Sequence, residues 1–235
     1  MPARSGRDSA ADEPGTEAAA THMAALVPVT ARGEATRRRI LDAAEDVFGE
    51  MGYYEASVSE ITRRAGVAQG TFYIYFHSKR ETFIELVEDI GDRLRATTSA
   101  AIQDAPNRIE AERLGYAAFF RFVYAHRRIY RIVEDAGRVA PEVAREYYRR
   151  ISLGYEHGLR AAILAGEIHD TNEEAIGYAL MGIAHFLALR WIIWPAEDDT
   201  GPEQTPTQPG QMSIPAGAFD AVVAFIARGL AGDRG

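Results

Sequence analysis

Hydrophobic and polar positions repeat at helical spacing along most of the chain. From about residue 35 to Met51, apolar side chains recur at steps of three and four, which predicts a helix with one buried face. Gly52 follows as a stop signal. Residues 1–30 lack this periodicity and are rich in Ala, Gly, Pro, Asp and Glu. We expect them to form a disordered or weakly ordered tail, because little there could offset the entropy of ordering.

Two capping boxes fix the register of the next section. In Ser57–Glu60 and again in Ser78–Glu81, a Ser hydroxyl and a Glu carboxylate stand three positions apart and can bond each other's backbone amides. The first box opens a short helix that turns at Gly66. A second short helix spans 69–76, and the second box starts a long helix that runs through Leu94.

The rest of the chain is also expected to be helical. A third capping spacing, Asp170 to Glu173, precedes an apolar helix, and residues 196–211 predict a loop because they are rich in Pro, Gly, Thr and Gln. The expected helices lie at about 108–125, 127–138, 141–166, 172–194 and 214–231. The pattern predicts an all-α protein: a tail over 1–30, a three-helix head over 31–78 and a helical domain over 79–235.

Composition narrows the chemistry that this fold can carry. The 235 residues include no cysteine, which excludes disulfides, thiolate metal sites and cysteine nucleophiles. The histidines His126, His157 and His185 fall on different predicted helices without an i, i+4 pair, so no metal site is expected. No Gly-rich phosphate loop or paired His and carboxylate at catalytic spacing supports an enzyme, and no cofactor is predicted.

One apolar window, Ile176–Trp194, approaches the length of a membrane span. It contains His185 and Arg190 and is followed by Pro195. A helix that is apolar nearly all round is either a membrane span or buried between protein surfaces. A single such window, without a secretory signal pattern in the first 30 residues, favours burial in a cytoplasmic protein that does not enter a membrane.

The distribution of charge permits nucleic-acid binding. The net charge is −8, but residues 31–80 carry eight basic and seven acidic side chains, whereas residues 81–235 carry sixteen basic and twenty-three acidic ones. Attraction to phosphates needs local positive charge rather than a basic average. The predicted head is therefore the one region of the chain that is not acidic.

The two short helices around Gly66 form a helix-turn-helix. In such a pair the second helix reads base edges with its N-terminal residues. Here that end presents Gln69, Gly70 and Thr71. Gln can pair with adenine through two hydrogen bonds, Thr can contact a thymine, and Gly allows close approach. Lys79 is the only lysine of the chain, and a cation at the start of a helix is easier to explain beside a phosphate.

The amino-acid sequence of residues 36–80 resembles the TetR family of one-component regulators. The similar segments, which lie within residues 36–80, are 39–44 with Phe48, Gly52-Tyr53, 61–67, 70–76 and Ser78-Lys79. One departure is Thr62, where the family usually has Ala. The resemblance implies a homodimeric regulator, usually a repressor, in which three helices bind double-stranded DNA, the fourth joins them to a regulatory core, and 176–194 and 214–231 pair across a two-fold axis.

The resemblance also implies roles for individual residues of the head. Gln69, Gly70 and Thr71 would read bases. The residues expected to touch phosphates are Arg37, Ser59, Tyr73, Tyr75 and Lys79.

Aromatic side chains crowd the helices beyond the head, more than one buried stripe requires. Apolar walls with a few hydroxyls are typical of small-molecule pockets, although each aromatic could equally fill a solid core. The residues expected to bind a ligand are Phe120, Tyr124, Tyr148, Ile151, Tyr155 and Phe186. The stretch 130–148 faintly resembles family members linked to acyl-CoA or aromatic catabolism.

The sequence is compatible with three hypotheses on function. The first is a repressor that leaves a palindromic operator when a small hydrophobic or aromatic effector, for example an acyl-CoA-like one, binds the core. The second is a DNA-binding regulator whose core binds a partner protein, which a solid core without a cavity would favour. The third is an all-α enzyme that uses the aromatic core as its active site.

Overall fold

The computed structural model of the chain describes residues 30–194 and 214–231, and within these ranges it is helical without any strand. The predicted all-α fold is confirmed. The expected tail, up to residue 29, and the expected loop at 196–211 lie outside the described residues.

The helices lie close to the predicted ones. Their bounds are α1 Ala31–Glu55, α2 Val58–Ala65, α3 Gln69–Tyr75, α4 Lys79–Ile102, α5 Arg108–Ala125, α6 Arg127–Val139, α7 Pro141–Leu164, α8 Glu173–Ala188, the π-helical turn η1 Leu189–Ile193, and α10 Ala216–Ala231. The stop predicted at Gly52 is a kink inside α1, where Gly52 has φ +77°, a backbone conformation that side chains with a Cβ disfavour.

The N-terminal caps follow the sequence in part. The hydroxyls of Ser57 and Ser78 accept from the amides of Glu60 and Glu81, at 3.2 and 3.1 Å. The Glu60 carboxylate does not complete the box, because it pairs with two arginines of its own helix. The cap predicted at Asp170 is wrong: the side chain of Asn172 caps α8, because it lies one residue before the first helical turn.

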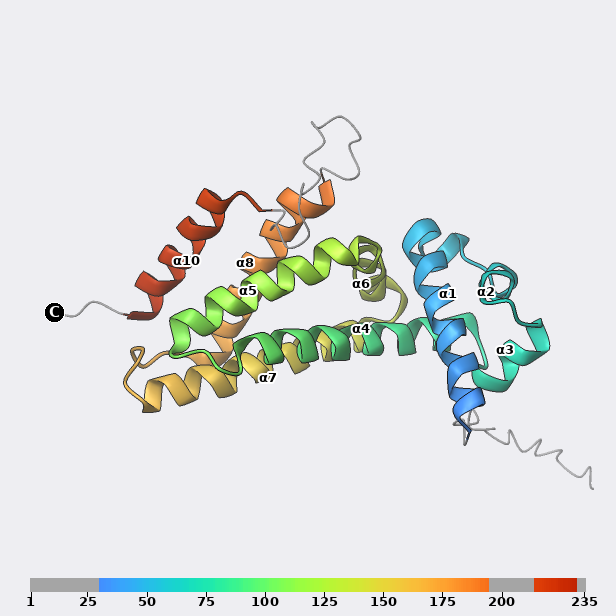
Figure 1. The fold of residues 1–235 in the computed structure, drawn as a ribbon, viewed down its shortest axis with the longest axis horizontal. Coiled ribbons are helices and arrows are strands. Elements are labelled where there is room, and N and C mark those ends of the chain that lie inside the picture. Colours follow the sequence, from blue (N-terminus) through green and yellow to red (C-terminus); the bar gives the residue numbers. More distant parts are fainter. Residues whose placement is uncertain (1–29, 195–213, 232–235) are drawn as a thin grey trace, which may run out of the picture.

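The helices form an elongated molecule with a small head at one end (Figure 1). Helices α1, α2 and α3 make up the head, and α4 runs from it along α5 and α7. One hydrophobic core joins α1–α4 to α6, and a second joins α5, α7, α8 and α10. Helix α6 therefore packs against the head while it belongs to the rest of the bundle.

Helix α6 holds the end of α1 through polar contacts. A carboxylate oxygen of Asp135 accepts from the amide of Tyr53 at 2.9 Å, directly after the kink in α1. The guanidinium of Arg131 donates to the carbonyl of Glu50 at 3.0 Å. Opposite Gly49 the two helices approach so closely that a Cβ there would overlap the Cβ of Arg128. Any shift of α6 is thus passed to α1.

The apolar helix is only partly covered. The stretch Glu173–Ile193 is long and apolar enough to cross a membrane, a test that core helices of soluble proteins also pass. Its inner face, which includes Leu180 and Ala184, lies in the second core, whereas Phe186 is 65% exposed. On the neighbouring α10, Phe225 is 64% exposed.

Candidate nucleic-acid interface and buried cavity

Local sequence explains the shape of the helix-turn-helix. Helix α2 ends at Gly66, whose left-handed backbone (φ +64°) lets the amide of Val67 return to the carbonyl of Thr62 at 3.1 Å. Helix α3 begins three residues later. Phe72 and Phe76 are fully buried in the core of the head and so anchor α3. The opposite face of α3 is left toward solvent.

The three predicted base-reading residues lie together at the start of α3. Gln69 and Gly70 are exposed and Thr71 is half-buried. A side chain placed at Gly70 would meet no atom of this chain within 4 Å, so the packing of the protein does not require a glycine there. Ala68, which precedes the helix, provides no side-chain cap.

The predicted phosphate contacts are distributed around this end of the head. Ser59 and Tyr73 are exposed and Tyr75 is half-buried. Arg37 pairs with Glu85 of α4 and lies 5.3 Å above the ring of Phe76. A phosphate would therefore have to compete with that carboxylate for Arg37.

Lys79 has a structural role, binding backbone carbonyls of α1, that the sequence did not predict. Its ammonium donates to the carbonyls of Tyr53 and Ala56, both at 2.8 Å, and lies 4.5 Å from the ring centre of Tyr53. Partial burial lowers the pKa of Lys79. These contacts fasten the end of α1 to the start of α4, so a neighbouring phosphate is not needed to explain a lysine there.

Most positive charges of the head are balanced within the protein. Glu60 accepts from Arg63 and Arg64, and these hydrogen bonds lower the pKa of Glu60 to about 2. Arg64 also pairs with Glu50 of α1. Arg63 nevertheless remains largely exposed. The head thus carries its arginines in local pairs at the surface rather than as one strongly basic patch.

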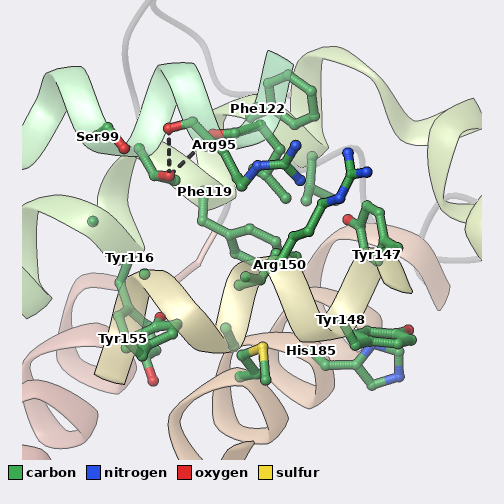
Figure 2. A pocket seen from close by; sticks show the side chains of 18 of the residues that line it. Arg95, Ser99, Tyr116, Phe119, Phe122, Tyr147, Tyr148, Arg150, Tyr155 and His185 are labelled. Atoms are coloured by element: carbon green, nitrogen blue, oxygen red, sulfur yellow. Dashed lines mark hydrogen bonds between the residues drawn. The ribbon is translucent and has the colours of Figure 1, made fainter. Parts of the chain in front are cut away.

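A cavity of about 230 Å³ lies between α4, α5, α6, α7 and α8 (Figure 2). Its wall is mainly aromatic and aliphatic, with a few charged groups. The residues that line it include Arg95, Arg108, Glu112, Tyr116, Phe119, Phe122, Tyr130, Glu134, Tyr147, Tyr148, Arg150, Ile151, Tyr155 and His185. Aromatic walls with a few convergent polar groups are typical of small-molecule sites.

Half of the predicted ligand residues line this cavity. Tyr148, Ile151 and Tyr155 are on its wall, all from α7. The other three predicted residues, Phe120, Tyr124 and Phe186, do not line it, each for its own physical reason. Phe120 points away from the cavity into the second core, where it meets Phe219 of α10 edge-on at 6.3 Å.

Tyr124 and Phe186 also lie outside the cavity wall. Tyr124 packs against the second core and beneath the guanidinium of Arg127, which is 4.3 Å from its ring centre. Phe186 is turned outward into solvent. Both lie on helices that line the cavity, but on faces of those helices that are turned away from it.

Sequence reasoning missed Phe119 and the charged residues of the wall. Phe119 is the neighbour of Phe120, and in a run of aromatics the apolar pattern does not show which side faces a void. Arg95 and Arg150 gave no signal, because isolated arginines on amphipathic helices usually belong to a solvated face.

Buried polar groups of the cavity bond mainly within the protein. The hydroxyl of Tyr116 donates to the carbonyl of Leu180 at 2.7 Å. Tyr130 and His185 hydrogen-bond side chain to side chain. Burial raises the pKa of both tyrosines and lowers that of His185. These groups are therefore neutral near pH 7 and suit an uncharged part of a ligand.

Arg108 and Glu112 form a buried ion pair at the α5 side of the cavity. Burial raises the pKa of Glu112, and the charge of Arg108 opposes that shift. No group of three or more His, Cys, Asp or Glu side chains that could hold a metal ion occurs among the described residues.

Together, the exposed start of α3 and the fold around it define a helix-turn-helix DNA-binding protein.

Comparisons with known proteins agree with that class. Residues 40–86 match the family described as bacterial regulatory proteins, tetR family. An HTH-type transcriptional regulator of Bacillus subtilis, YdgC, is 27% identical over 172 residues, which are 71% of this chain and 86% of the relative. The fatty acid metabolism regulator protein of the same organism is 45% identical over 51 residues, 22% of this chain and 26% of that one.

Solved structures show the same fold over most of the chain. The fatty acid degradation regulator FadR from Bacillus halodurans has a TM-score of 0.65 at 21% identity, and the match covers 85% of this chain and 96% of that one. FadR from Bacillus subtilis, solved in complex with stearoyl-CoA, has a TM-score of 0.64 at 20% identity and covers 82% and 98%. The chain is thus similar to transcriptional regulators, and its residues 40–86 are a DNA-binding head of the tetR family.

Proposed function

We propose that the protein is a homodimeric repressor that leaves a palindromic operator when a hydrophobic effector fills the cavity. The cavity is the single observation that carries this proposal, because a DNA-binding head by itself does not explain a void of about 230 Å³ lined by aromatic side chains. A solid core would instead have favoured control by a partner protein. The relatives described as fatty acid regulators favour an effector with an aliphatic or acyl part.

The DNA contacts that we propose are those at the start of α3. Gln69 and Thr71 read base edges in the major groove, and Gly70 lets the backbone approach the bases. The open space around Gly70 supports this role, since no intramolecular contact accounts for the glycine. Ser59, Tyr73 and Tyr75 are the proposed phosphate ligands, with Arg37 and Lys79 contributing where their intramolecular pairs allow. The proposed DNA-binding domain is 31–78, and 79–235 is the regulatory domain.

The dimer that we propose uses the outer faces of α8 and α10. Large apolar side chains left in solvent mark interaction surfaces when they gather on one face. Phe186 and Phe225 are exposed on these two helices, and Trp194 is exposed at the end of η1. A two-fold pairing of this surface would cover the apolar helix and set the distance between two reading heads.

Coupling between the cavity and the head runs through α4 and α6 in this proposal. Tyr130 and Glu134 of α6 line the cavity, and Asp135 of the same helix bonds the end of α1. An effector that changes the position of α6 or α4 changes the angle of the head. To alter operator occupancy substantially, it must bind one state more tightly than the other by a few kcal/mol.

The test begins with selection of bound duplexes from random DNA, followed by footprinting of the enriched site. We expect a two-fold symmetric footprint and its loss when a hydrophobic effector is added. Failure to enrich any site would contradict the DNA-binding part of the proposal. An enriched site that no hydrophobic compound releases would contradict the effector part.

A further inference from the structure

Two arginines occupy one end of the cavity. Arg95 comes from α4 and Arg150 from α7, and Figure 2 shows both guanidinium groups at the same end, near Phe122 and Tyr147. The side chain of Arg95 is 27% exposed and that of Arg150 is 42% exposed. Both are thus reachable from solvent and from the cavity.

The carboxylates that balance these arginines do not line the cavity. Arg95 pairs with Asp92, three residues earlier on α4, and Nε of Arg150 pairs with Glu146 at 2.8 Å on α7. Neither carboxylate belongs to the cavity wall. Exposed pairs of this local kind are weak, so a ligand with a better-placed anion can replace them.

The acidic groups that do line the cavity lie elsewhere on its wall. Glu112 is bound by Arg108 in the buried pair. Glu134 lines the cavity from α6, whereas Arg95 and Arg150 come from α4 and α7. The end that holds Arg95 and Arg150 therefore presents two guanidinium groups beside an apolar wall, while the acids nearest to them, Asp92, Glu146 and Glu88, do not line the cavity.

We propose that Arg95 and Arg150 together bind the anionic group of an amphipathic effector, a carboxylate or a phosphate, whose apolar part lies along Phe119 and Ile151. Guanidinium groups bind such anions through paired, charge-assisted hydrogen bonds. The inference rests on the proposed function, and it narrows the effector from any hydrophobic molecule to one with a negatively charged head.

Through α4, this site also connects the effector to the DNA-binding head. Helix α4 starts at Lys79, directly after the helix-turn-helix, and carries Arg95 to the cavity. An anion that accepts hydrogen bonds from both guanidinium groups links α4 to α7 directly, which the local pairs within each helix do not. Binding therefore draws this part of α4 toward α7 and changes the position of the head.

The test compares ligands that share one apolar chain and differ in their heads. Calorimetric titrations of the full-length protein use dodecanoate, dodecanoyl-CoA and the uncharged dodecanol. We expect at least one of the two anionic ligands to bind at least about tenfold more tightly than dodecanol. Tight binding of the thioester alone would assign the head to a phosphate, and tight binding of dodecanoate would assign it to a carboxylate.

Variants identify the arginines that carry the preference. R95Q/R150Q is expected to lose at least about tenfold in affinity for the anionic ligand and to bind dodecanol unchanged. R150Q alone, at a half-exposed position, gives part of that loss without a risk to folding. The matched control is R149Q, because Arg149 pairs with the same Glu146 and does not line the cavity.

Three outcomes overturn the inference: dodecanol binds as tightly as the anions, R95Q/R150Q keeps the preference while it melts as the wild type does, or none of the three ligands binds. The proposed function is judged separately, by release of the operator. If dodecanol released the operator as well as the anions do, the effector mechanism would stand and the anionic head would not.

Discussion

Gln69 stands exposed at the start of α3, and its side chain has no part in the core of the head. A residue that is free of packing duties and faces the proposed major groove should affect DNA affinity without affecting stability. The same holds for Gly70, around which the chain leaves open space.

We expect Gln69→Ala to weaken binding to the selected operator by about 1–3 kcal/mol, because a two-pronged contact to one base is lost. Binding to unrelated DNA should not change, since phosphate contacts remain. Fluorescence anisotropy with both duplexes measures the difference. Gln103→Ala, an exposed glutamine at the far end of α4, is the control. Equal losses on both duplexes would show that Gln69 reads no base.

Lys79 separates a structural role from a DNA-binding role. Its ammonium holds two carbonyls at the end of α1, so Lys79→Met should lower the free energy of unfolding by about 1–2 kcal/mol. The neighbouring Arg80→Gln, which removes an exposed pair with Glu142, should change it by less than about 0.5 kcal/mol. Urea unfolding measures both. If Lys79→Met left the free energy of unfolding unchanged, the structural role would be contradicted, and the phosphate contact predicted from the sequence would be the better explanation of Lys79.

Only some of the residues that line the cavity could be predicted from the sequence. Tyr148, Ile151 and Tyr155 could be predicted because they recur at steps of three and four and so share one face of α7. Phe120 could not be told from Phe119, since a helix with aromatics on several sides buries some in the core and turns others to the void. Only the position of α10, set by contacts distant in sequence, decides which is which.

At the scale of elements, most of the fold could be predicted because each helix carries its own signals. Start and end residues such as Ser57, Gly66 and Ser78 act through bonds to nearby amides and carbonyls, which the local sequence determines. The failure at Asp170 has the same origin: Asp170 and Asn172 are both good caps, and the choice depends on how α8 docks against α7.

Helix α6 lies close to α1 at Gly49 but leaves open space at its own Gly137, so opposite effects are expected when each glycine becomes alanine. Gly49→Ala should destabilise the protein by about 1–3 kcal/mol, because its Cβ would overlap that of Arg128 and force the helices apart. Gly137→Ala, in open space on α6, should stabilise it by up to about 1 kcal/mol. Chemical unfolding of both variants measures these signs. A stabilised Gly49→Ala would show that the two helices are not in rigid contact.

At the scale of the whole molecule, the outward faces of α8 and α10 leave large apolar side chains in solvent, among them Phe186 and Phe225. Sequence reasoning weighed a membrane span against burial between protein surfaces. The structure places one face of α8 in the core and leaves Phe186 outside. The proposed pairing of two chains would cover the other face and also position two heads on one operator.

Phe225→Arg should shift the protein from dimer to monomer, because it places a charge in the proposed apolar interface. Sedimentation velocity measures the mass directly. Tyr54→Arg is the control, since Tyr54 is equally exposed (66%) but lies in the head, away from that interface. The monomeric variant should also lose most of its affinity for the palindrome. A dimer that persists in Phe225→Arg would place the interface elsewhere.

The measurement that tests the central claim most directly is the thermodynamic coupling between cavity and operator. Operator affinity is measured without effector and with saturating effector, and effector affinity is measured with and without operator. If one equilibrium between two states links the sites, each ligand must weaken the other by the same factor. We expect equal factors of at least about tenfold, which a differential affinity of about 1.4 kcal/mol supplies. Operator affinity that is unchanged at saturating effector would contradict the claim that the cavity controls the DNA-binding head.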